Sequence, residues 1–376
     1  MNKTLRISSL VLLSWAIQQT AAAQDEAIIE AALRPLPEDL RANAAVVTYD
    51  EQTGERIVLR AGNNQVECQP PNAETGFTRC ASAADAPRRD LSAKLSAEGL
   101  SGADLADALA QAEADGRIPP ATFGSMRYRV YDNDDRIKYL WVVSLPNAMP
   151  EELGMSLAAQ RDSSLAGQGL PWMMREGTPS AHLMIPINGT PLSNPGDTDF
   201  RLDTAAIDDP VEQATLPLPE DLRAGAAVVR YDTSTGERHV LREGTNFIEC
   251  QPRNPDNGFT VCYNESDAPE QALRAKLAAE GKSGAEIGDA IAAAAESGEI
   301  NRAPFGSMIY RLYEEDDRLK LLWVMRLPNA TPDQLGMPTG SQRDASLAGQ
   351  GLPWMMAEGT PQAHLMIPIN STPLSN

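Results

Sequence analysis

The sequence of 376 residues predicts an α+β fold in which two tandem copies of one domain each contain a mainly antiparallel sheet, two helices and one disulfide. A shift of 182 positions superimposes residues 36–194 on residues 218–376 without a gap. Both copies contain two cysteines at matching places, and both combine period-two strand patterns with helical stripes. This period exceeds the roughly 20–50 residues of solenoid repeats, so each copy is expected to have its own core.

Each copy is predicted to begin with a β-hairpin. Residues 44–49 and 56–60 are rich in strand-forming residues and flank a turn sequence that ends in Gly54. A third short strand, residues 65–68, leads into the loop between the cysteines. The second copy repeats the hairpin pattern at residues 226–231 and 238–242.

Two helices are predicted in the middle of each copy. Asp85 and Pro87 favour a helix start, and Gly99 favours its end. Ser101 is suited to cap a second helix with one apolar stripe. The stripe comprises Leu105, Ala108, Leu109 and Ala112 in the first copy and Ile287, Ala290, Ile291 and Ala294 in the second.

The last part of each copy is predicted to contain a second hairpin and a closing strand. Alternating apolar and polar residues predict a strand over residues 126–131, and the apolar run 139–145 predicts its partner. Residues 182–187 predict the closing strand, with His182 and Met184 on one face. We expect the two helices to cover one face of the resulting sheet.

The N-terminus has the layout of a secretory signal peptide. Lys3 and Arg6 precede an apolar run, and small residues lead to Ala23, which predicts a signal over residues 1–23 with cleavage near Ala23. No apolar stretch reaches the roughly 20 residues of a membrane helix. We therefore expect a periplasmic or secreted protein without a transmembrane segment in the mature chain.

The charge of the chain limits its partners. With 32 basic and 52 acidic residues the net charge is −20, which repels phosphate backbones and disfavours nucleic acid as a partner. A small molecule or another envelope protein fits better. Residues 24–35 form an N-terminal segment before the first repeat, and the acidic stretch 195–217 is interpreted as a flexible linker between the repeats.

The four cysteines are interpreted as two disulfides. Cys68 and Cys80, like Cys250 and Cys262, are separated by eleven residues at the same place in each copy. Export into an oxidising compartment favours disulfide formation. A thiolate metal site would need a second close pair or a nearby histidine, and neither is present, so no metal site and no cofactor are expected.

The C-terminal segment of each repeat is a candidate binding site. Residues 160–194 match the second copy at 31 of 35 positions, whereas residues 82–122 match at only 20 of 41. The segment is rich in Gly and Pro and is interpreted as mostly loop, where such sameness suggests function. Trp141 is expected in the core and Trp172 at the surface. The predicted binding residues are Trp172, Glu176 and His182, with Trp354, Glu358 and His364 in the second copy.

Several sequence segments resemble a family of uncharacterised exported bacterial proteins. The similarity lies in Leu59-Arg60-Ala61-Gly62-Asn63 before the cysteine pair, in Pro171-Trp172-Met173-Met174, and in the run from Gly177 to Pro186. It covers each copy nearly end to end, although members of that family are usually single-domain and have tryptophans in the helical middle that this chain lacks. The resemblance implies a secreted domain and no established activity.

Three functions remain open from the sequence. The favoured one is a noncatalytic binding or structural module, displayed twice so that two weak contacts combine. The alternative is a hydrolytic enzyme that uses His182 and His364 as bases, with partners among Ser125, Ser164, Thr178, Asp162 and Glu176. The third is a periplasmic copper binder built from His182, Met184, Met173 and Met174.

Overall fold

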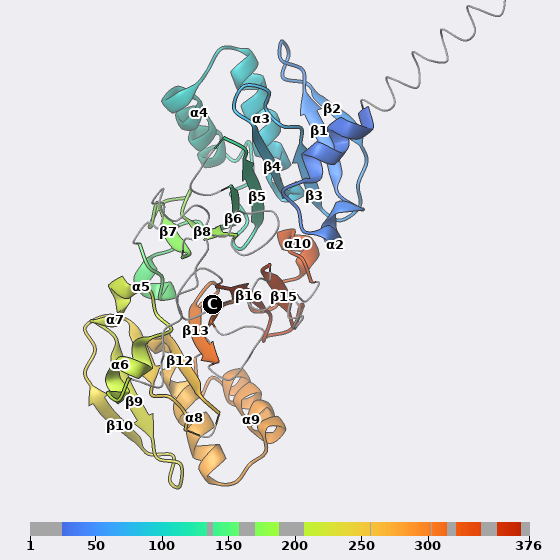
Figure 1. Cartoon of the computed structure of the whole chain (residues 1–376). Coiled ribbons are helices and arrows are strands. Elements are labelled where there is room, and N and C mark those ends of the chain that lie inside the picture. Colours follow the sequence, from blue (N-terminus) through green and yellow to red (C-terminus); the bar gives the residue numbers. More distant parts are fainter. Residues whose placement is uncertain are drawn as a thin grey trace, which may run out of the picture. The chain divides into compact units, whose positions relative to one another are not determined.

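The computed structural model describes residues 25–133, 138–157, 170–187, 207–255, 257–301, 303–313, 321–339 and 352–369 (Figure 1). None of the helices in these ranges is long and apolar enough to cross a bilayer. Internal contacts divide the chain into two compact units, residues 1–120 with 127–133 and residues 121–126 with 134–376. The boundary between the units therefore falls inside the first repeat.

The first copy contains one eight-stranded sheet with the order β2-β1-β3-β4-β5-β6-β8-β7. β1 and β3 are parallel, whereas β1 and β2, β3 and β4, β4 and β5, β6 and β8, and β7 and β8 are antiparallel. This gives the mainly antiparallel sheet that the sequence predicts. The strands are β1 (Ala45–Tyr49), β2 (Arg56–Arg60), β3 (Val66–Gln69), β4 (Phe77–Ser82), β5 (Met126–Tyr131), β6 (Tyr139–Ser144), β7 (Trp172–Met174) and β8 (His182–Pro186).

The second copy repeats this topology with the order β10-β9-β11-β12-β13-β14-β16-β15, so the tandem α+β fold is confirmed. β9 and β11 are parallel, like β1 and β3. The strands are β9 (Ala227–Tyr231), β10 (Arg238–Arg242), β11 (Ile248–Gln251), β12 (Phe259–Asn264), β13 (Met308–Tyr313), β14 (Leu321–Arg326), β15 (Trp354–Met356) and β16 (His364–Pro368).

The two predicted helices form an antiparallel pair in each copy. They are α3 (Ala86–Ala97) and α4 (Gly102–Ala114) in the first copy, and α8 (Ala268–Ala279) and α9 (Gly284–Ser297) in the second, each pair preceded by a 3₁₀ turn, η1 (Ala83–Asp85) or η4 (Glu265–Asp267). Leu109, Ala112 and Ile118 pack against Leu91, Leu95 and Leu105, which joins α4 to α3. Ser283 caps α9 through a reciprocal capping box with Glu286.

The hairpin turn positions α3 through a close backbone contact. Gly54 has φ +67°, and a Cβ added there would lie 2.5 Å from the Lys94 Cα atom. Gly236 has φ +73° and approaches Lys276 in the same way. Glycine is therefore required at both turns, because any side chain would push the helix away from the hairpin.

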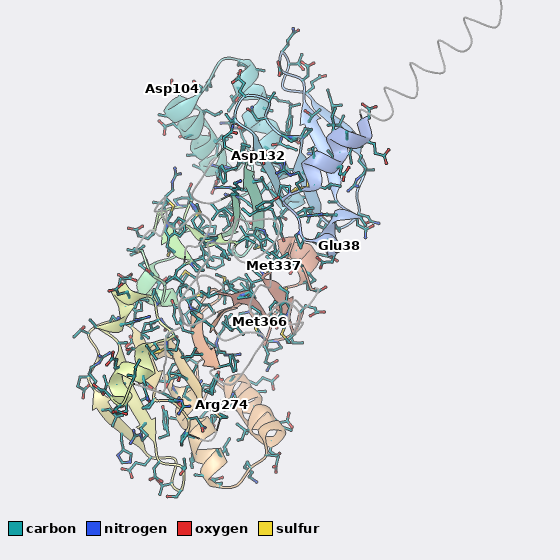
Figure 2. All side chains as sticks on the ribbon, viewed as in Figure 1. Glu38, Asp104, Asp132, Arg274, Met337 and Met366 are labelled. Carbon is teal, nitrogen blue, oxygen red and sulfur yellow. A yellow bond between two sulfur atoms is a disulfide. The ribbon has the colours of Figure 1, made fainter. Side chains whose placement is uncertain are left out.

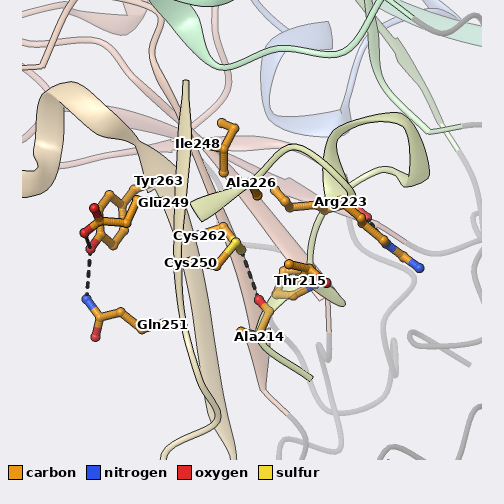
Figure 3. The surroundings of a disulfide bond; sticks show 12 residues. Ala214, Thr215, Arg223, Ala226, Ile248, Glu249, Cys250, Gln251, Cys262 and Tyr263 are labelled. Carbon is orange, nitrogen blue, oxygen red and sulfur yellow. Dashed lines mark hydrogen bonds between the residues drawn. A yellow bond between two sulfur atoms is a disulfide. The ribbon is translucent and has the colours of Figure 1, made fainter. Parts of the chain in front are cut away.

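Both predicted disulfides are present, Cys68–Cys80 between β3 and β4 and Cys250–Cys262 between β11 and β12. Figure 3 shows the second one pointing toward Ala214, while Tyr263 and Glu249 lie on the other side of the two strands. The Cys262 sulfur lies 3.2 Å from the Ala214 carbonyl oxygen. The disulfide therefore lies on one face of the sheet, and the α8–α9 pair lies on the other.

A further helix lies on the disulfide face of each copy. Residues 25–33 are helical, and the Ala32 carbonyl lies 3.4 Å from the Cys80 sulfur. The equivalent helix is α6 (Pro210–Thr215), which starts at the Asp209 cap. Residues 210–215 belong to the stretch interpreted as a flexible linker, and for them that interpretation is wrong because Ala214 and Thr215 are buried.

Short helices complete the described fold, and one of them joins the two repeats. These helices are α2 (Glu38–Arg41), α5 (Pro150–Leu153), α7 (Glu220–Arg223) and α10 (Pro332–Leu335). The Glu151 carbonyl of α5 accepts a hydrogen bond from the Asn264 amide at 3.0 Å, and Ser156 donates to Asp221 at 2.7 Å. The C-terminal part of the first repeat therefore packs on the second repeat within one compact unit.

Two strands were not expected from the sequence. β4 lies in what was interpreted as a cysteine loop, and β7 lies in a segment interpreted as mostly loop. β4 has strands on both sides, so its pairing with β3 and β5 outweighs its mixed sequence. β7 has only three residues and is held by β8, a length too short for a recognisable alternating pattern.

Candidate functional site

The predicted C-terminal site is mostly interior. Trp172 lies opposite Met184, and Met174 lies opposite His182, so these four side chains share one face of the β7–β8 pair. Trp172 is only 1% exposed, which makes the expectation of a surface tryptophan wrong, whereas Trp141 is buried as expected. Trp172 is buried because β7 pairs with β8, which places its side chain on a covered face of the sheet. Glu176 is exposed in the following turn.

The second copy shows the same arrangement. Trp354 packs in an apolar cluster with Tyr263 and Met366, and Glu358 is exposed. His364 is half-buried, and its Nδ1 lies 2.7 Å from the Gln362 carbonyl oxygen, as the Nδ1 of His182 does from Ser180. Because a carbonyl only accepts, Nδ1 is the protonated nitrogen. Burial lowers the pKa of His364, the contact with the Gln362 carbonyl opposes this shift, and the nearby arginines add to it.

The hydrogen bond at His182 Nδ1 differs from that of a catalytic triad. A backbone carbonyl takes the place that an orienting carboxylate holds in a triad. Ser125 is fully buried, and the Thr178 hydroxyl donates to the Arg175 carbonyl at 2.7 Å. Glu176 is exposed, and the remaining candidates, Ser164 and Asp162, lie outside the described residues.

The copper set is divided between two faces of the sheet. His182, Met174 and Met184 share a face, whereas Met173 lies opposite Leu183 on the other. Within the described ranges, no group of three or more His, Cys, Asp or Glu residues is placed to hold a metal ion.

A different site emerges on the helix-covered face of β3, β4 and β5. Strand register places Gln69, Arg79 and Arg129 in one row across the three strands. Directly beside it, Glu67, Ala81 and Arg127 form a second row. Side chains in such rows lie within reach of one another. Three basic side chains from β4 and β5 therefore gather under the helices.

Helix α3 and the turn before it complete a cavity of about 200 Å³, here called the arginine cavity. α3 contributes Arg88, Arg89 and Ser92, and η1 contributes Asp85. Leu109 comes from α4, and Phe77 from β4 forms a wall of the cavity. The whole lining is Phe77, Arg79, Cys80, Ala81, Asp85, Arg88, Arg89, Ser92, Leu109, Arg127 and Arg129, all within the first compact unit.

Three of the five lining arginines are neutralised by carboxylates. Arg89, which is 8% exposed, pairs with Glu67 and donates to the Ser82 carbonyl at 3.1 Å. Arg127 pairs with Asp85 at 3.1 Å. Arg88 pairs with Glu113 of α4 at 2.6 Å. These pairs fasten α3 to the sheet on one side and to α4 on the other.

The other two arginines, Arg79 and Arg129, form no ion pair among the residues that the structure describes. The Nε of Arg79 donates to Gln69, and Arg129 donates to the Tyr131 hydroxyl at 3.4 Å. Burial, together with the adjacent positive charges of Arg89, Arg129 and Arg127, lowers the pKa of Arg79 to about 10 against the opposing effect of Tyr49. The guanidinium stays charged at neutral pH, in a cavity with an excess of positive charge.

The second copy fills the equivalent space with apolar side chains. Val261 replaces Arg79, Tyr263 replaces Ala81, and Ile309 replaces Arg127. Tyr263 is fully buried, and its hydroxyl donates to Glu249 at 2.6 Å. The same hydroxyl accepts a hydrogen bond from Gln251 at 3.3 Å (Figure 3). Tyr263 and Ile309 belong to one apolar cluster with Leu322, Val324, Trp354 and Met366.

A smaller cavity of about 120 Å³ in the second copy lies beside Arg326 and Arg274, the latter labelled in Figure 2. Arg326 pairs with Asp267 at 3.2 Å and with Glu270 at 3.4 Å. Arg274 also pairs with Glu270. Each arginine in this lining has a carboxylate partner, so this cavity lacks the charge excess of the arginine cavity.

From the sequence, Arg129 and Arg311 are candidates only for a groove beside the tryptophans. The arginine cavity itself was not anticipated, although two signals pointed to it. Arg127 and Arg129 alternate on a predicted strand, and Arg88 and Arg89 sit where the second copy has Glu270 and Gln271. Residues 82–122 are also the least alike between the copies. No family model, curated protein or solved structure matches this chain, so the candidate site rests on its own geometry.

Proposed function

We propose that the chain is an exported, noncatalytic binding module in which the first copy takes up a small ligand in the arginine cavity and the second copy serves as a filled scaffold. The proposal keeps the binding module favoured by the sequence and moves its site from the C-terminal segment to the β3–β5 face. Two disulfides agree with an oxidising compartment, as the signal-like N-terminus suggests.

The two copies differ most clearly in how they fill the space under the first long helix. At the same position of the same fold, one copy keeps a cavity of about 200 Å³ lined by charged side chains, and the other packs a buried tyrosine there. A charged lining that packs against no side chain adds little stability, because withdrawing charge from water carries a desolvation cost. Such a feature is more readily explained by ligand binding than by stability.

The experiment uses ligand-observed NMR on the full-length chain with a fragment library of anionic, neutral and cationic members. The double variant A81Y/R89Q transfers the tyrosine and the glutamine of the second copy into the first, and should fill the cavity. Fragments that contact the natural chain should be lost in this variant. The matched control is Q271A, at the equivalent helix position of the second copy, which should retain them.

Two results would contradict the proposal. If fragments bind the natural chain and A81Y/R89Q equally, ligand binding does not take place in the arginine cavity. Turnover of a generic ester, peptide or glycoside substrate that disappears in the variant H182A/H364A would replace a binding module by the hydrolytic alternative.

A further inference from the structure

We propose that the arginine cavity binds the carboxylate or phosphate group of a small organic anion between Arg79 and Arg129, at one site per chain. This inference rests on the proposed binding function of the first copy and names the chemistry of its ligand.

Two like charges face each other directly across the β4–β5 pair. Arg79 of β4 and Arg129 of β5 are opposite residues in the antiparallel register. Like charges directly opposite on neighbouring strands destabilise a sheet. The second copy relieves the same position, because Val261 stands opposite Arg311. An anion between the two guanidinium groups would remove this repulsion in the first copy.

The charges of the cavity lining do not balance. Arg88, Arg89 and Arg127 each have a carboxylate partner within hydrogen-bond distance. Arg79 and Arg129 have none in the described part of the chain, which leaves an excess of two positive charges. That excess occurs in a protein whose net charge is −20, so it runs against the overall composition. A bound anion would balance it.

The arginine cavity combines hydrogen-bond donors with apolar walls. Arg79 commits its Nε to Gln69, so its two terminal nitrogens remain to form a fork. A guanidinium fork matches the paired oxygens of a carboxylate or phosphate. Phe77, Ala81 and Leu109 supply apolar wall, and the Ser92 side chain supplies a hydroxyl group. This combination suits an acid group attached to an apolar body.

Isothermal titration calorimetry on the full-length chain tests the inference with three probes of one shape: benzoate, phenyl phosphate and neutral benzamide. We expect benzoate, phenyl phosphate or both to bind with one site per chain and benzamide not to bind. The preferred acid distinguishes a carboxylate ligand from a phosphate ligand. Added salt should weaken the binding, because the attraction is electrostatic.

The variant R79V introduces the residue of the second copy and should weaken binding about tenfold or more, the effect of losing hydrogen bonds to a charged group. R79K keeps the charge without the fork and should fall between R79V and the natural chain. R311V, at the second-copy position equivalent to Arg129, is the matched control and should leave binding unchanged. Circular dichroism confirms that each variant is folded.

Several outcomes would overturn the anion inference. They are equal binding of benzoate and benzamide, two sites per chain, unchanged affinity in R79V, or no binding of any probe at millimolar concentration. If neutral or cationic fragments bind the natural chain and not A81Y/R89Q, the proposed binding function stands and only the anion inference fails. If nothing depends on the cavity, both fail together.

Discussion

The glutamates at equivalent positions of the two copies have different hydrogen-bond and ion-pair partners. In the first, Glu67 of β3 pairs with Arg56 and with Arg89, which reaches down from α3. In the second, Glu249 of β11 pairs with Arg238 and accepts a hydrogen bond from Tyr263 on the neighbouring strand. The tyrosine fills the space under the helix, whereas the arginine leaves it open. A few substitutions on one sheet face thus convert a packed core into a charged cavity.

The aspartate before the first long helix shows a second exchange of this kind. Asp85 pairs with Arg127 of β5, whereas Asp267 pairs with Arg326 of β14. Neither arginine has an equivalent in the other copy. The position of Arg127 is occupied by Ile309 in the second copy, and the position of Arg326 is occupied by Ser144 in the first. Each copy keeps its buried aspartate paired, but the arginine comes from a different strand. The fold therefore requires an arginine partner for this aspartate but allows that arginine to come from different strands.

The largest expected effect is the loss of the tyrosine that fills the second copy. Y263A should lower the free energy of unfolding by about 3–5 kcal/mol, the usual cost of removing a buried aromatic side chain. Y263F removes only the hydroxyl and should cost about 1–2 kcal/mol. Urea denaturation measures both changes. Equal effects of the two variants would show that Tyr263 does not fill the core as the structure indicates.

The two glutamates should differ in importance. E67Q leaves Arg89 buried without a charged partner and should destabilise the protein by about 3 kcal/mol. E249Q should cost about 1 kcal/mol, because Arg238 is more exposed and Tyr263 still has an oxygen to bind. Denaturation of the two single variants gives the comparison. If E249Q lowered the free energy of unfolding more than E67Q, the second copy would depend more strongly on its glutamate than the first, contrary to this expectation.

The disulfides should contribute equally. Both join residues with a sequence separation of 12, so on the chain-entropy model each stabilises its copy by about 3 kcal/mol. The variants C68A/C80A and C250A/C262A are matched controls for one another, and chemical denaturation measures both. A large difference between them would mean that the two copies have diverged on the disulfide face as well.

The pH dependence of stability should come in part from Asp267. Burial raises the pKa of this carboxyl group to about 6 against the pull of Arg326. Its folded pKa therefore exceeds its unfolded pKa near 3.8, so protonation favours folding and stability falls as the pH rises from 4 to 7. Two pKa units bound the effect at about 3 kcal/mol.

D267N should remove this part of the pH dependence, whereas D85N, the equivalent change in the first copy, should leave it in place. Thermal unfolding of both variants at a series of pH values provides the measurement. If the stability of D267N still falls as steeply as that of the natural chain, the pH dependence has another source.

Much of the architecture could be predicted from the sequence because it depends on local pattern. The hairpins, the α3–α4 pair and the cysteine pairs follow from alternation, helix-boundary residues and spacing, and all are confirmed, although Ser101 makes no side-chain capping hydrogen bond. β4 and β7 were missed because their formation depends on neighbours distant in the chain. The placement of Trp172 was wrong for the same reason.

The arginine cavity could not be predicted because its parts become neighbours only through strand register. Arg79 and Arg129 are 50 positions apart in the sequence and meet because β4 pairs with β5. The pairing of Arg88 with Glu113 likewise depends on the packing of α3 against α4. Without knowledge of the strand register, these five arginines cannot be distinguished from ordinary charged residues at the surface of an acidic protein.

Anomalous diffraction from a crystal of the full-length chain soaked in bromide tests the central claim most directly, because it compares the two copies in one molecule. The account predicts a bromide peak within hydrogen-bond distance of the guanidinium groups of Arg79 and Arg129, and none between Val261 and Arg311. Peaks of equal height in both copies, or no peak in the arginine cavity, would contradict it.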